Sequence, residues 1–251
     1  MTDALVLSQA DGAIGRLTLN DPGRANALSS AMMAALSDAL ADFAADPAIR
    51  VIVLGAAGRI FCAGHDLAEL RSTDDLAAHE ALFAQCSALM LAIGACPKPV
   101  IAHVRGAAVA AGCQLVASCD LAYAVDTARF AVSGVNLGLF CSTPGVALSR
   151  AVGRKDALEM LLTGRFVGAA EAAAMGLINR AVPAADPDAA VEEAARAIAS
   201  KPPEAIALGK RVFGRQIVLA PEDAYAVASR AMAENLGFQS AKQGIDGFLK
   251  R

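Results

Sequence analysis

The sequence predicts an α/β fold in which strands and helices alternate over the first 150 residues and helices dominate afterwards. Short apolar runs rich in Val and Ile, bounded by Gly and Pro, are separated by stretches with apolar residues at helical spacing. Beyond residue 152 helical spacing recurs six times, with one strand candidate among the helices. A length of 251 residues suits one large domain, or one domain with a small appendage.

A hairpin, a helix and a strand are expected at the start of the chain. Residues 5–8 and 14–19 are predicted strands on either side of the turn signal Asp11-Gly12. A helix is expected after Ser29 and up to about residue 45, because apolar residues follow at helical spacing until Asp46-Pro47. Residues 49–54 form a continuous β-branched run, which is typical of a strand buried on both faces.

The same alternation recurs in the middle of the chain. A predicted helix over 76–94 ends at a Pro-Lys-Pro break, and a strand over 100–104, a short helix over 112–118 and a strand over 121–125 follow. The later helices are expected at residues 155–162, 169–175, 188–199, 204–213, 222–235 and 240–249, with the strand candidate at 178–182. The last 50 residues are therefore expected to form a helical annex.

Composition excludes several classes of protein. Sixty residues are Ala, so the hydrophobic fraction of 56% contains only an ordinary share of larger apolar residues. No run of 18 uncharged apolar residues occurs, and we expect no membrane association. The net charge of −3, with Lys and Arg scattered, offers no basic stripe for a nucleic acid.

Metal, disulfide and secretion signals are also missing from the sequence. The six Cys residues form no CxxC pair and the three His residues are not paired at ligand spacing, so we expect neither a metal site nor a disulfide framework, and no separate cofactor. Met1-Thr2-Asp3 starts without a basic or apolar targeting segment, which predicts a cytoplasmic location.

Two loops combine Gly and small residues directly after a buried strand. The first runs from Gly58 through Phe61-Cys62-Ala63-Gly64-His65-Asp66, and the second from Gly106 through Ala110-Ala111-Gly112-Cys113-Gln114. Free backbone N–H groups at such strand-to-helix transitions can hold an anionic oxygen. The same glycines can equally serve tight turns and close packing, and neither loop matches a nucleotide-phosphate motif.

Together with further motifs, these loops resemble the crotonase superfamily, also called the enoyl-CoA hydratase/isomerase family. The motifs that carry the resemblance are at residues 26–28, 61–67, 97–102, 112–115, 119–120, 161–164 and 176–179. The resemblance implies a spiral of ββα units over residues 1–195, carrying an acyl-CoA site, and a helical region over 196–251 used for trimerisation. It also implies a homotrimer or a homohexamer built as a dimer of trimers.

The family mechanism implies an oxyanion hole for an acyl-CoA thioester, with coenzyme A as part of the substrate. By position its two backbone N–H donors are those of His65 and Ala111, and each donor of such a site contributes roughly 10²–10³ in rate. Gly64, Gly112 and Asp66 belong to the same motifs. The adenine and phosphate end of the substrate is expected at Arg24 and Ala63 and, from a neighbouring subunit, at Phe248 and Lys250.

The sequence departs from a hydratase at both catalytic glutamates. The family positions align with Gln114 and Gly134, and neither an amide nor a glycine exchanges protons near neutral pH. Residues 134–145, which include Asn136 and Cys141, resemble the branch called enoyl-CoA hydratase domain-containing proteins, whose members also lack the glutamate pair. The resemblance therefore implies a lyase-class enzyme of fatty-acid or related acyl-CoA metabolism whose hydratase activity is doubtful.

Two alternatives remain open. The chain could be a non-catalytic acyl-CoA-binding or regulatory protein, or a decarboxylase of a malonyl-type acyl-CoA, since Ala63-Gly64-His65-Asp66 also resembles a decarboxylase branch. The side chains of His65 and Gln114 could contact substrate or complete local packing, and Asp66 and Asp120 could cap helices. Cys141 is expected in a Pro-Gly turn as an unreactive thiol, and the role of Asn136 is undecided.

Overall fold

The computed structural model describes residues 4–250. Residues 1–3, on which the location prediction drew, and residue 251 lie outside the described residues. Two sheets organise the described chain. The first has the strand order β1-β2-β3-β5-β7-β10 and the second the order β4-β6-β8-β9. The strands are β1 Val6–Asp11, β2 Ile14–Leu19, β3 Val51–Ala56, β4 Ile60–Cys62, β5 Val100–Val104, β6 Ala107–Val109, β7 Leu121–Val125, β8 Arg129–Ala131, β9 Val167–Gly168 and β10 Arg180–Val182.

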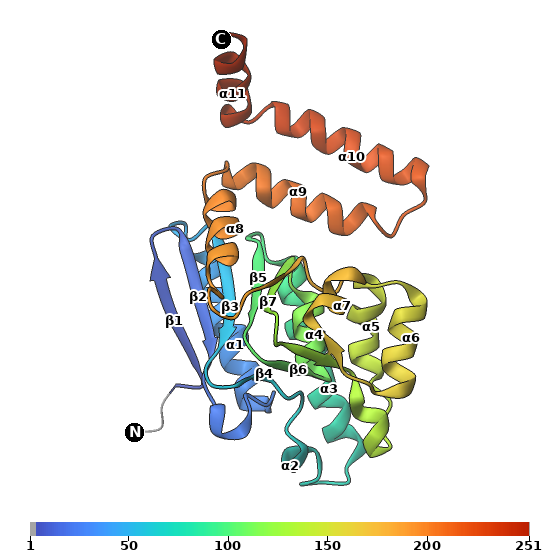
Figure 1. Cartoon of the computed structure of the whole chain (residues 1–251). Coiled ribbons are helices and arrows are strands. Elements are labelled where there is room, and N and C mark those ends of the chain that lie inside the picture. Colours follow the sequence, from blue (N-terminus) through green and yellow to red (C-terminus); the bar gives the residue numbers. More distant parts are fainter. Residues whose placement is uncertain (1–3, 251) are drawn as a thin grey trace.

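Helices cover the sheets and form the C-terminal part (Figure 1). They are α1 Ser30–Ala45, α2 Leu67–Leu70, α3 Leu76–Ala95, α4 Ala111–Ser118, α5 Ser142–Ala151, α6 Arg154–Thr163, α7 Ala169–Ala174, α8 Ala189–Ala199, α9 Pro203–Gln216, α10 Pro221–Leu236 and α11 Gln239–Leu249. Two 3₁₀ helices, η1 Pro22–Arg24 and η2 Ser133–Leu137, lie in loops.

The expected ββα spiral is confirmed. Three successive units each give one parallel strand to the first sheet and one to the second before a helix follows: β3 and β4, β5 and β6, and β7 and β8. Antiparallel pairs occur at β1–β2 and at β8–β9. Because each unit turns from one sheet into the other, the loops after β4 and β6 lie side by side. These loops belong to the two glycine-containing segments that the sequence analysis singled out.

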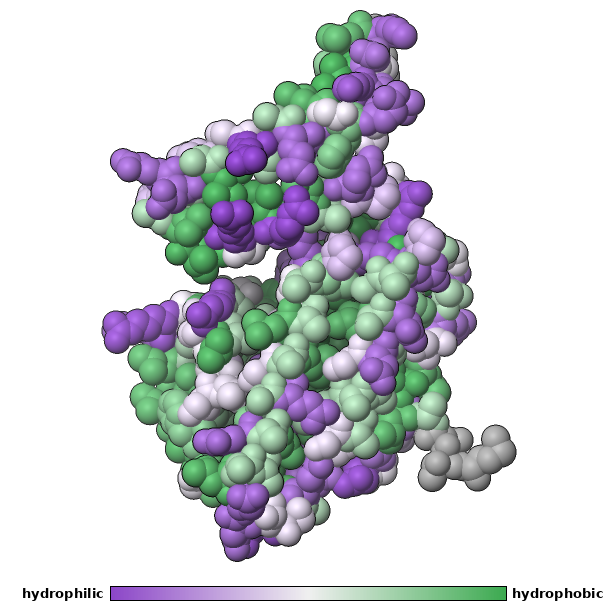
Figure 2. Space-filling view, turned by 180° about the vertical axis from the view of Figure 1, so that it is seen from behind, coloured by the Kyte–Doolittle hydropathy of each residue, from purple (hydrophilic) through white to green (hydrophobic). Residues whose placement is uncertain are grey.

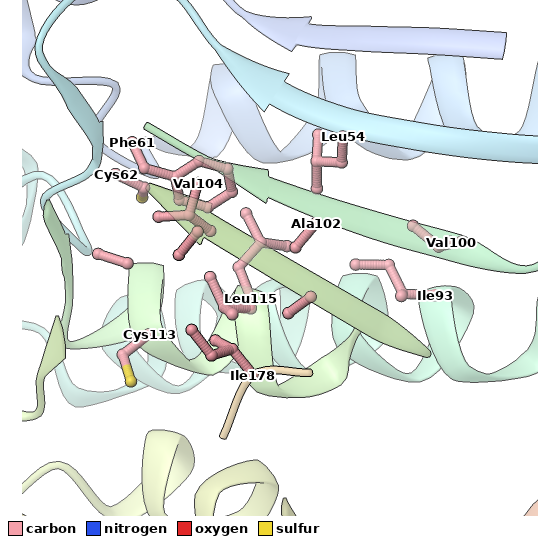
Figure 3. Close-up of a cluster of buried hydrophobic side chains, with 14 of the residues drawn as sticks. Leu54, Phe61, Cys62, Ile93, Val100, Ala102, Val104, Cys113, Leu115 and Ile178 are labelled. Atoms are coloured by element: carbon pink, nitrogen blue, oxygen red, sulfur yellow. The ribbon is translucent and has the colours of Figure 1, made fainter. Parts of the chain in front are cut away.

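The core lies between the first sheet and the helices (Figure 3). β3 and β5 contribute Leu54, Ala102 and Val104, and Leu115 of α4 packs against them from the helical side. Every residue of β5 is buried, as expected for a parallel strand that is covered on both faces. The apolar runs of the sequence therefore form the centre of the spiral.

The predicted strands 14–19, 100–104 and 121–125 coincide with the observed ones, and β3 begins two residues later than expected. The second sheet was not predicted, because strands of two or three residues leave no periodic pattern. Helix α5 was also missed. Cys141 is its N-terminal cap rather than part of a Pro-Gly turn, and Pro144 fits the first helical turn because no backbone N–H is needed there.

By length and apolar composition, α3 is the one helix of residues 4–250 that could span a membrane. Its buried stripe (Cys86, Leu89, Met90 and Ile93) packs against α1 and α4, and Glu80 and Gln85 interrupt its apolar sequence. This stripe is the buried side of α3, and most residues of its apolar window are not buried.

The C-terminal helices leave the body of the molecule one after another. Helix α8 packs against β2, β3 and β5, whereas α10 contacts α9 and α11. Figure 1 shows α9, α10 and α11 stacked beyond one end of the sheets. A groove of about 660 Å³ separates α9 from the body, and Figure 2 shows the hollow on this side of the molecule.

Candidate active site

A cavity of about 600 Å³, here called the site cavity, opens where the two glycine loops meet. Its lining comes from the loop after β4, from β6 and the start of α4, from α2 and α3, and from η2 with the start of α5. The lining residues are Ala63, His65, Leu67, Leu70, Phe83, Val109, Ala110, Ala111, Ser133, Gly134, Asn136, Leu137, Leu139, Phe140, Cys141, Ser142, Thr143 and Pro144. Most of the wall is apolar, which suits an acyl group.

Gly64 brings the two loops into contact. Its φ is +96°, and a Cβ there would lie 3.0 Å from the carbonyl oxygen of Val109 and 3.3 Å from the backbone nitrogen of Ala111. A side chain at this position would combine backbone strain with overlap, so only Gly allows this approach. His65 and Ala111 consequently lie next to this contact, and both line the site cavity.

Both of these N–H groups lack a protein acceptor. Within residues 4–250 neither the His65 nor the Ala111 N–H donates a backbone hydrogen bond. Ala111 is fully buried and is the first residue of α4, where an N–H has no intrahelical partner. Ala110 before it adopts φ +49°, an uncommon conformation for a residue with a Cβ, which turns the chain sharply into the helix. The arrangement offers two donors to a ligand oxygen.

The His65 side chain is half-buried in the cavity wall. Its Nδ1 lies 3.4 Å from the carbonyl oxygen of Leu28, and its ring packs edge-on against Phe83 with 5.3 Å between the ring centroids. Nε2 is buried and has no hydrogen-bond partner. Burial lowers the pKa of His65 below its usual 6.5, against the opposing effects of the Leu28 carbonyl and Glu69.

Arg24 and Asp66 meet at the outer edge of the first loop. They form an ion pair in which Asp66 is buried and Arg24 is 57% exposed. Asp66 also caps α2 by accepting from the backbone N–H of Ala68 at 2.9 Å and of Glu69 at 3.3 Å. Ala63, from the same loop as Asp66, lies on the wall of the site cavity. The structure thus gives Asp66 a capping and pairing role.

Asn26 was recognised only as part of a motif, and the structure explains its presence. It is fully buried, and its Nδ2 donates to the carbonyl oxygens of Ala57 and Ile60 at 2.9 and 2.8 Å. Its Oδ1 accepts from the N–H of Asp21 at 2.8 Å. Asn26 therefore holds η1 against the loop between β3 and β4, which positions Arg24.

Gln114 does not line the site cavity. It lines a neighbouring cavity of about 380 Å³ between α3, α4 and α5, here called the side cavity, and Thr143 belongs to both linings. Gln114 is 4% exposed, and its Oε1 is buried without a hydrogen-bond partner. A polar atom in this state is costly unless a ligand or water satisfies it.

Gly134 has no room for a side chain. Its N–H donates to Cys141 Sγ at 3.3 Å, and a Cβ there would lie 2.5 Å from the Leu139 carbonyl oxygen and 2.8 Å from that sulfur. Burial raises the pKa of the Cys141 thiol, so the sulfur stays protonated at neutral pH. Asn136 is exposed on η2 with its amide next to Gly164.

The remaining candidates divide between the site and the far end of the chain. A Cβ at Gly112 would lie 2.2 Å from the carbonyl oxygen of Cys62, so this Gly permits α4 to pack on β4. Phe248 is 75% exposed on α11, and Lys250 follows this helix. Figure 1 places α11 at the opposite end of the molecule from α2, so a single chain does not bring these two residues to the cavity.

The apolar wall was not predicted. Leu67 and Leu70 from α2, Phe83 from α3, and Leu139 and Phe140 from the loop before α5 all line the cavity. In the sequence these residues are only apolar positions next to the glycine-loop motifs, and nothing there indicates that they line a cavity. Among the described residues, no three His, Cys, Asp or Glu side chains gather as metal ligands do.

Comparison with known proteins gives consistent matches over nearly the whole chain. The family model described as enoyl-CoA hydratase/isomerase matches residues 9–251. The enoyl-CoA hydratase domain-containing protein 3 of Xenopus laevis is 44% identical over 250 residues, covering 100% of this chain and 85% of that protein. A putative enoyl-CoA hydratase of Thermus thermophilus is 38% identical over 245 residues, covering 96% of both.

Solved structures agree with the same fold. The crystal structure of an enoyl-CoA hydratase of Mycobacterium smegmatis matches with a TM-score of 0.96 and 53% identity, covering 98% of this chain and 96% of that one. Human enoyl-CoA hydratase domain-containing protein 3 matches with a TM-score of 0.96 and 43% identity, covering 98% and 97%. The vertebrate relatives carry the word mitochondrial in their names, which does not fit a plain cytoplasmic prediction for this chain.

Proposed function

The chain belongs to the enoyl-CoA hydratase/isomerase family, and we propose that it binds acyl-CoA thioesters and stabilises their enolates in the site cavity. The backbone N–H groups of His65 and Ala111 hold the thioester oxygen. The observation that carries this proposal is the contact at Gly64, which aligns two backbone donors that have no protein acceptor. The apolar wall from α2, α3 and η2 receives the acyl group.

The reaction is not a glutamate-dependent hydration. Gln114 faces the side cavity with an unpartnered amide oxygen, and the backbone around Gly134 has no space for a carboxylate side chain. General acid–base help of about 10²–10⁴ per group is therefore absent at both positions. The proposed role lies in fatty-acid or related acyl-CoA metabolism through enolate chemistry.

The coenzyme A part extends from the cavity past Ala63 toward Arg24, whose guanidinium is more than half exposed and can meet a phosphate. We assign Phe248 and Lys250 of a neighbouring copy to the same end of the ligand. A trimer, or a dimer of trimers, would bring α11 of one copy to the cavity of another and would cover the exposed Phe248.

Calorimetry with butyryl-CoA and free coenzyme A tests the binding, and product analysis with crotonoyl-, malonyl- and hydroxyacyl-CoA tests the chemistry. We expect Gly64→Ala to abolish acyl-CoA binding and to destabilise the protein by more than about 2 kcal/mol, from left-handed strain and overlap. The matched control is Gly12→Ala. Gly12 has φ +57°, and nothing lies within 4 Å of a Cβ added there. It should cost about 1 kcal/mol and leave binding intact.

The outcomes separate the candidate functions. Loss of a proton from Cα, or turnover of one thioester, supports the enzyme. Binding without any turnover would instead favour a non-catalytic acyl-CoA-binding protein, and release of CO₂ from malonyl-type thioesters would favour the decarboxylase. If no acyl-CoA binds, the proposed function is wrong.

A further inference from the structure

A polar pocket of about 260 Å³, here called the sheet pocket, lies between the first sheet and the start of α8. Because side chains alternate along a strand, His103 of β5 lies on the opposite face from Ala102 and Val104, which belong to the core. Helix α8 packs against β2, β3 and β5 on the side of His103. Within the described chain, no residue of this pocket lines the site cavity or the side cavity. The lining residues that matter here are Arg16, Thr18, Gly55, His103, Arg105 and Asp188.

Gly55 is a glycine inside a regular strand. It pairs with Thr18 of β2 in an uninterrupted register, and its φ is outside the left-handed region. A Cβ added to Gly55 would have the carbonyl oxygen of His103, 4.0 Å away, as its nearest neighbour. Neither a bulge nor close packing within residues 4–250 therefore accounts for the missing side chain. A strand glycine of this kind marks a place where a ligand can approach the backbone.

His103 presents an unused acceptor to the same space. The residue is only 8% exposed, and its Nε2 lies 3.0 Å from the carbonyl oxygen of Pro187. A carbonyl oxygen only accepts, so Nε2 carries the hydrogen and Nδ1 has a lone pair. Within residues 4–250, Nδ1 makes no hydrogen bond, and it is not among the fully enclosed polar atoms that lack a partner. Nδ1 therefore keeps accessible surface, and His103 lines the sheet pocket.

Two arginines border the pocket, one from β2 and one from the turn after β5, and carboxylates fix their guanidinium groups. Arg105 pairs with Asp188. Arg16 pairs with Glu192 at 2.5 Å and with Asp11 at 3.5 Å. All three contacts use Nη2, and among the described residues Nη1 of both arginines and Nε of Arg16 donate no hydrogen bond. Guanidinium groups held in this way have donors left for an oxyanion.

The groups that face His103 leave its ring neutral at pH 7. Burial is the largest cause of its lowered pKa, and the charges of Arg105 and Arg16 lower it further, against the opposing effects of Asp188 and a backbone hydrogen bond. β3 contributes no charged residue to the lining, and β7 places Tyr123 opposite His103 in the register. A neutral ring accepts a hydrogen bond at Nδ1, so the pocket combines cationic donors with one acceptor.

We propose that the sheet pocket binds a phosphate ion. The free N–H groups of Arg16 and Arg105 donate to phosphate oxygens, and the O–H of hydrogen phosphate donates to Nδ1 of His103. A sulfate or a carboxylate carries no proton at neutral pH and would leave Nδ1 without a donor. The volume of about 260 Å³ is below the roughly 300–1,000 Å³ typical of sites for organic ligands, so the pocket suits the ion rather than a phosphate ester.

Calorimetry with inorganic phosphate at pH 7.5 tests the proposal. We expect the parent protein to bind phosphate with a Kd of about 1 mM or less, and sulfate about tenfold more weakly. Glucose 6-phosphate should also bind more weakly, because its sugar does not fit the pocket. Equal binding of sulfate would overturn the contact with His103, and tighter binding of glucose 6-phosphate would overturn the assignment to the free ion.

Filling the pocket from its floor is the most direct variant. Gly55→Val should weaken phosphate binding by about tenfold or more, because its side chain takes the space of the ion. Its urea unfolding midpoint should be unchanged or higher, since a β-branched residue suits a strand. Gly55→Ala is the matched control, because one methyl leaves most of the pocket open. Full phosphate binding by Gly55→Val would overturn the inference.

A second pair of variants tests the cationic donors independently of Gly55. Arg16→Gln should weaken phosphate binding by about 10–100-fold, through the loss of charge-assisted hydrogen bonds. Arg196→Gln is its control, since Arg196 also pairs with Glu192, at 3.6 Å, but is 75% exposed and is outside the pocket lining. That variant should bind phosphate within about twofold of the parent. Equal effects of the two changes would contradict the proposed contacts.

Competition with butyryl-CoA separates this site from the proposed acyl-CoA site. A saturating concentration of butyryl-CoA should leave the Kd for phosphate unchanged, because the two cavities share no lining residue of the described chain. Displacement of phosphate by butyryl-CoA would place the ion in the acyl-CoA site and overturn the inference, as would a parent protein that binds no phosphate. Butyryl-CoA binding by Gly55→Val should equal that of the parent, so the two proposals can fail separately.

Discussion

At the scale of single residues, Gly134 shows why an absent catalytic group can be part of the local structure. Its N–H donates to Cys141 Sγ, and its carbonyl oxygen accepts from the N–H of Leu139 at 2.9 Å. These bonds fold η2 tightly over the cavity and occupy the space that a Cβ would need. Installing glutamates at positions 114 and 134 would therefore disturb this loop before it restored any chemistry.

We predict opposite effects of one substitution at two glycines. Gly134→Ala should destabilise the protein by about 1–3 kcal/mol, because its Cβ would overlap the Leu139 carbonyl and the Cys141 sulfur. Gly94→Ala should stabilise by about 0.5–1 kcal/mol, because Gly94 is helical and nothing lies within 4 Å of its added Cβ. Urea unfolding of both variants checks this, and equal effects would contradict it.

At the scale of elements, a single Lys docks α9 on the spiral. Lys210 Nζ donates to the carbonyl oxygens of Ile93 and Lys98 at 3.0 and 3.2 Å and pairs with Asp120 at 2.7 Å. Its side chain is 11% exposed, and Asp120 also accepts from the N–H of Val100. The Lys therefore joins α9 to the end of α3 and the start of β5 across the groove that Figure 2 shows.

Lys210→Met is predicted to destabilise the protein by about 2–4 kcal/mol, because it leaves the Asp120 carboxylate and two carbonyls without their cation. Arg211→Met is the matched control, since Arg211 is 68% exposed and lies 3.6 Å from Glu234. That change should stay within about 0.5 kcal/mol. Hydrogen exchange in α9 should rise only in the Lys210 variant. Equal protection in both would show that Lys210 does not hold the helix.

The elements that could be predicted from the sequence are those with a long periodic pattern. The hairpin and strands such as β5 and β7 follow from apolar runs, and the two motif loops follow from their resemblance to the family. The second sheet, α5 and the side cavity could not be predicted, because each depends on neighbours remote in the sequence. The same holds for the crowded Cβ position of Gly134 and the unpartnered Oε1 of Gln114.

At the scale of the whole molecule, the C-terminal helices leave large apolar side chains uncovered. These side chains are Phe213, Ile217, Val218, Tyr225, Met232, Leu236, Ile245, Phe248 and Leu249. A surface of this kind marks a contact between proteins, and the family resemblance implies that other copies of the chain supply it. The proposed assembly is a trimer or a dimer of trimers.

Light scattering after size exclusion tests the assembly. The parent protein should elute at three or six times the mass of the chain. Leu236→Asp on α10 should shift the population toward smaller species, because an unpaired charge is costly in an apolar interface. Leu76→Asp is the control, since Leu76 is 70% exposed but lies at the start of α3. A monomeric parent would contradict the prediction.

Two histidines in different parts of the molecule, the half-buried His65 and the buried His103, should make its stability depend on pH. Burial is the largest cause of the lowered pKa of both His65 and His103, and Arg105 lowers that of His103 further. Between the lowered values and the usual 6.5, the unfolded chain binds more protons than the folded one, so stability rises with pH in this window. It should fall as the pH drops below about 6.5. Urea unfolding measured across this range should show the slope in the parent, a smaller slope in His65→Gln and in His103→Gln, and the smallest in the double variant. An unchanged slope in the double variant would assign the acid sensitivity to other groups.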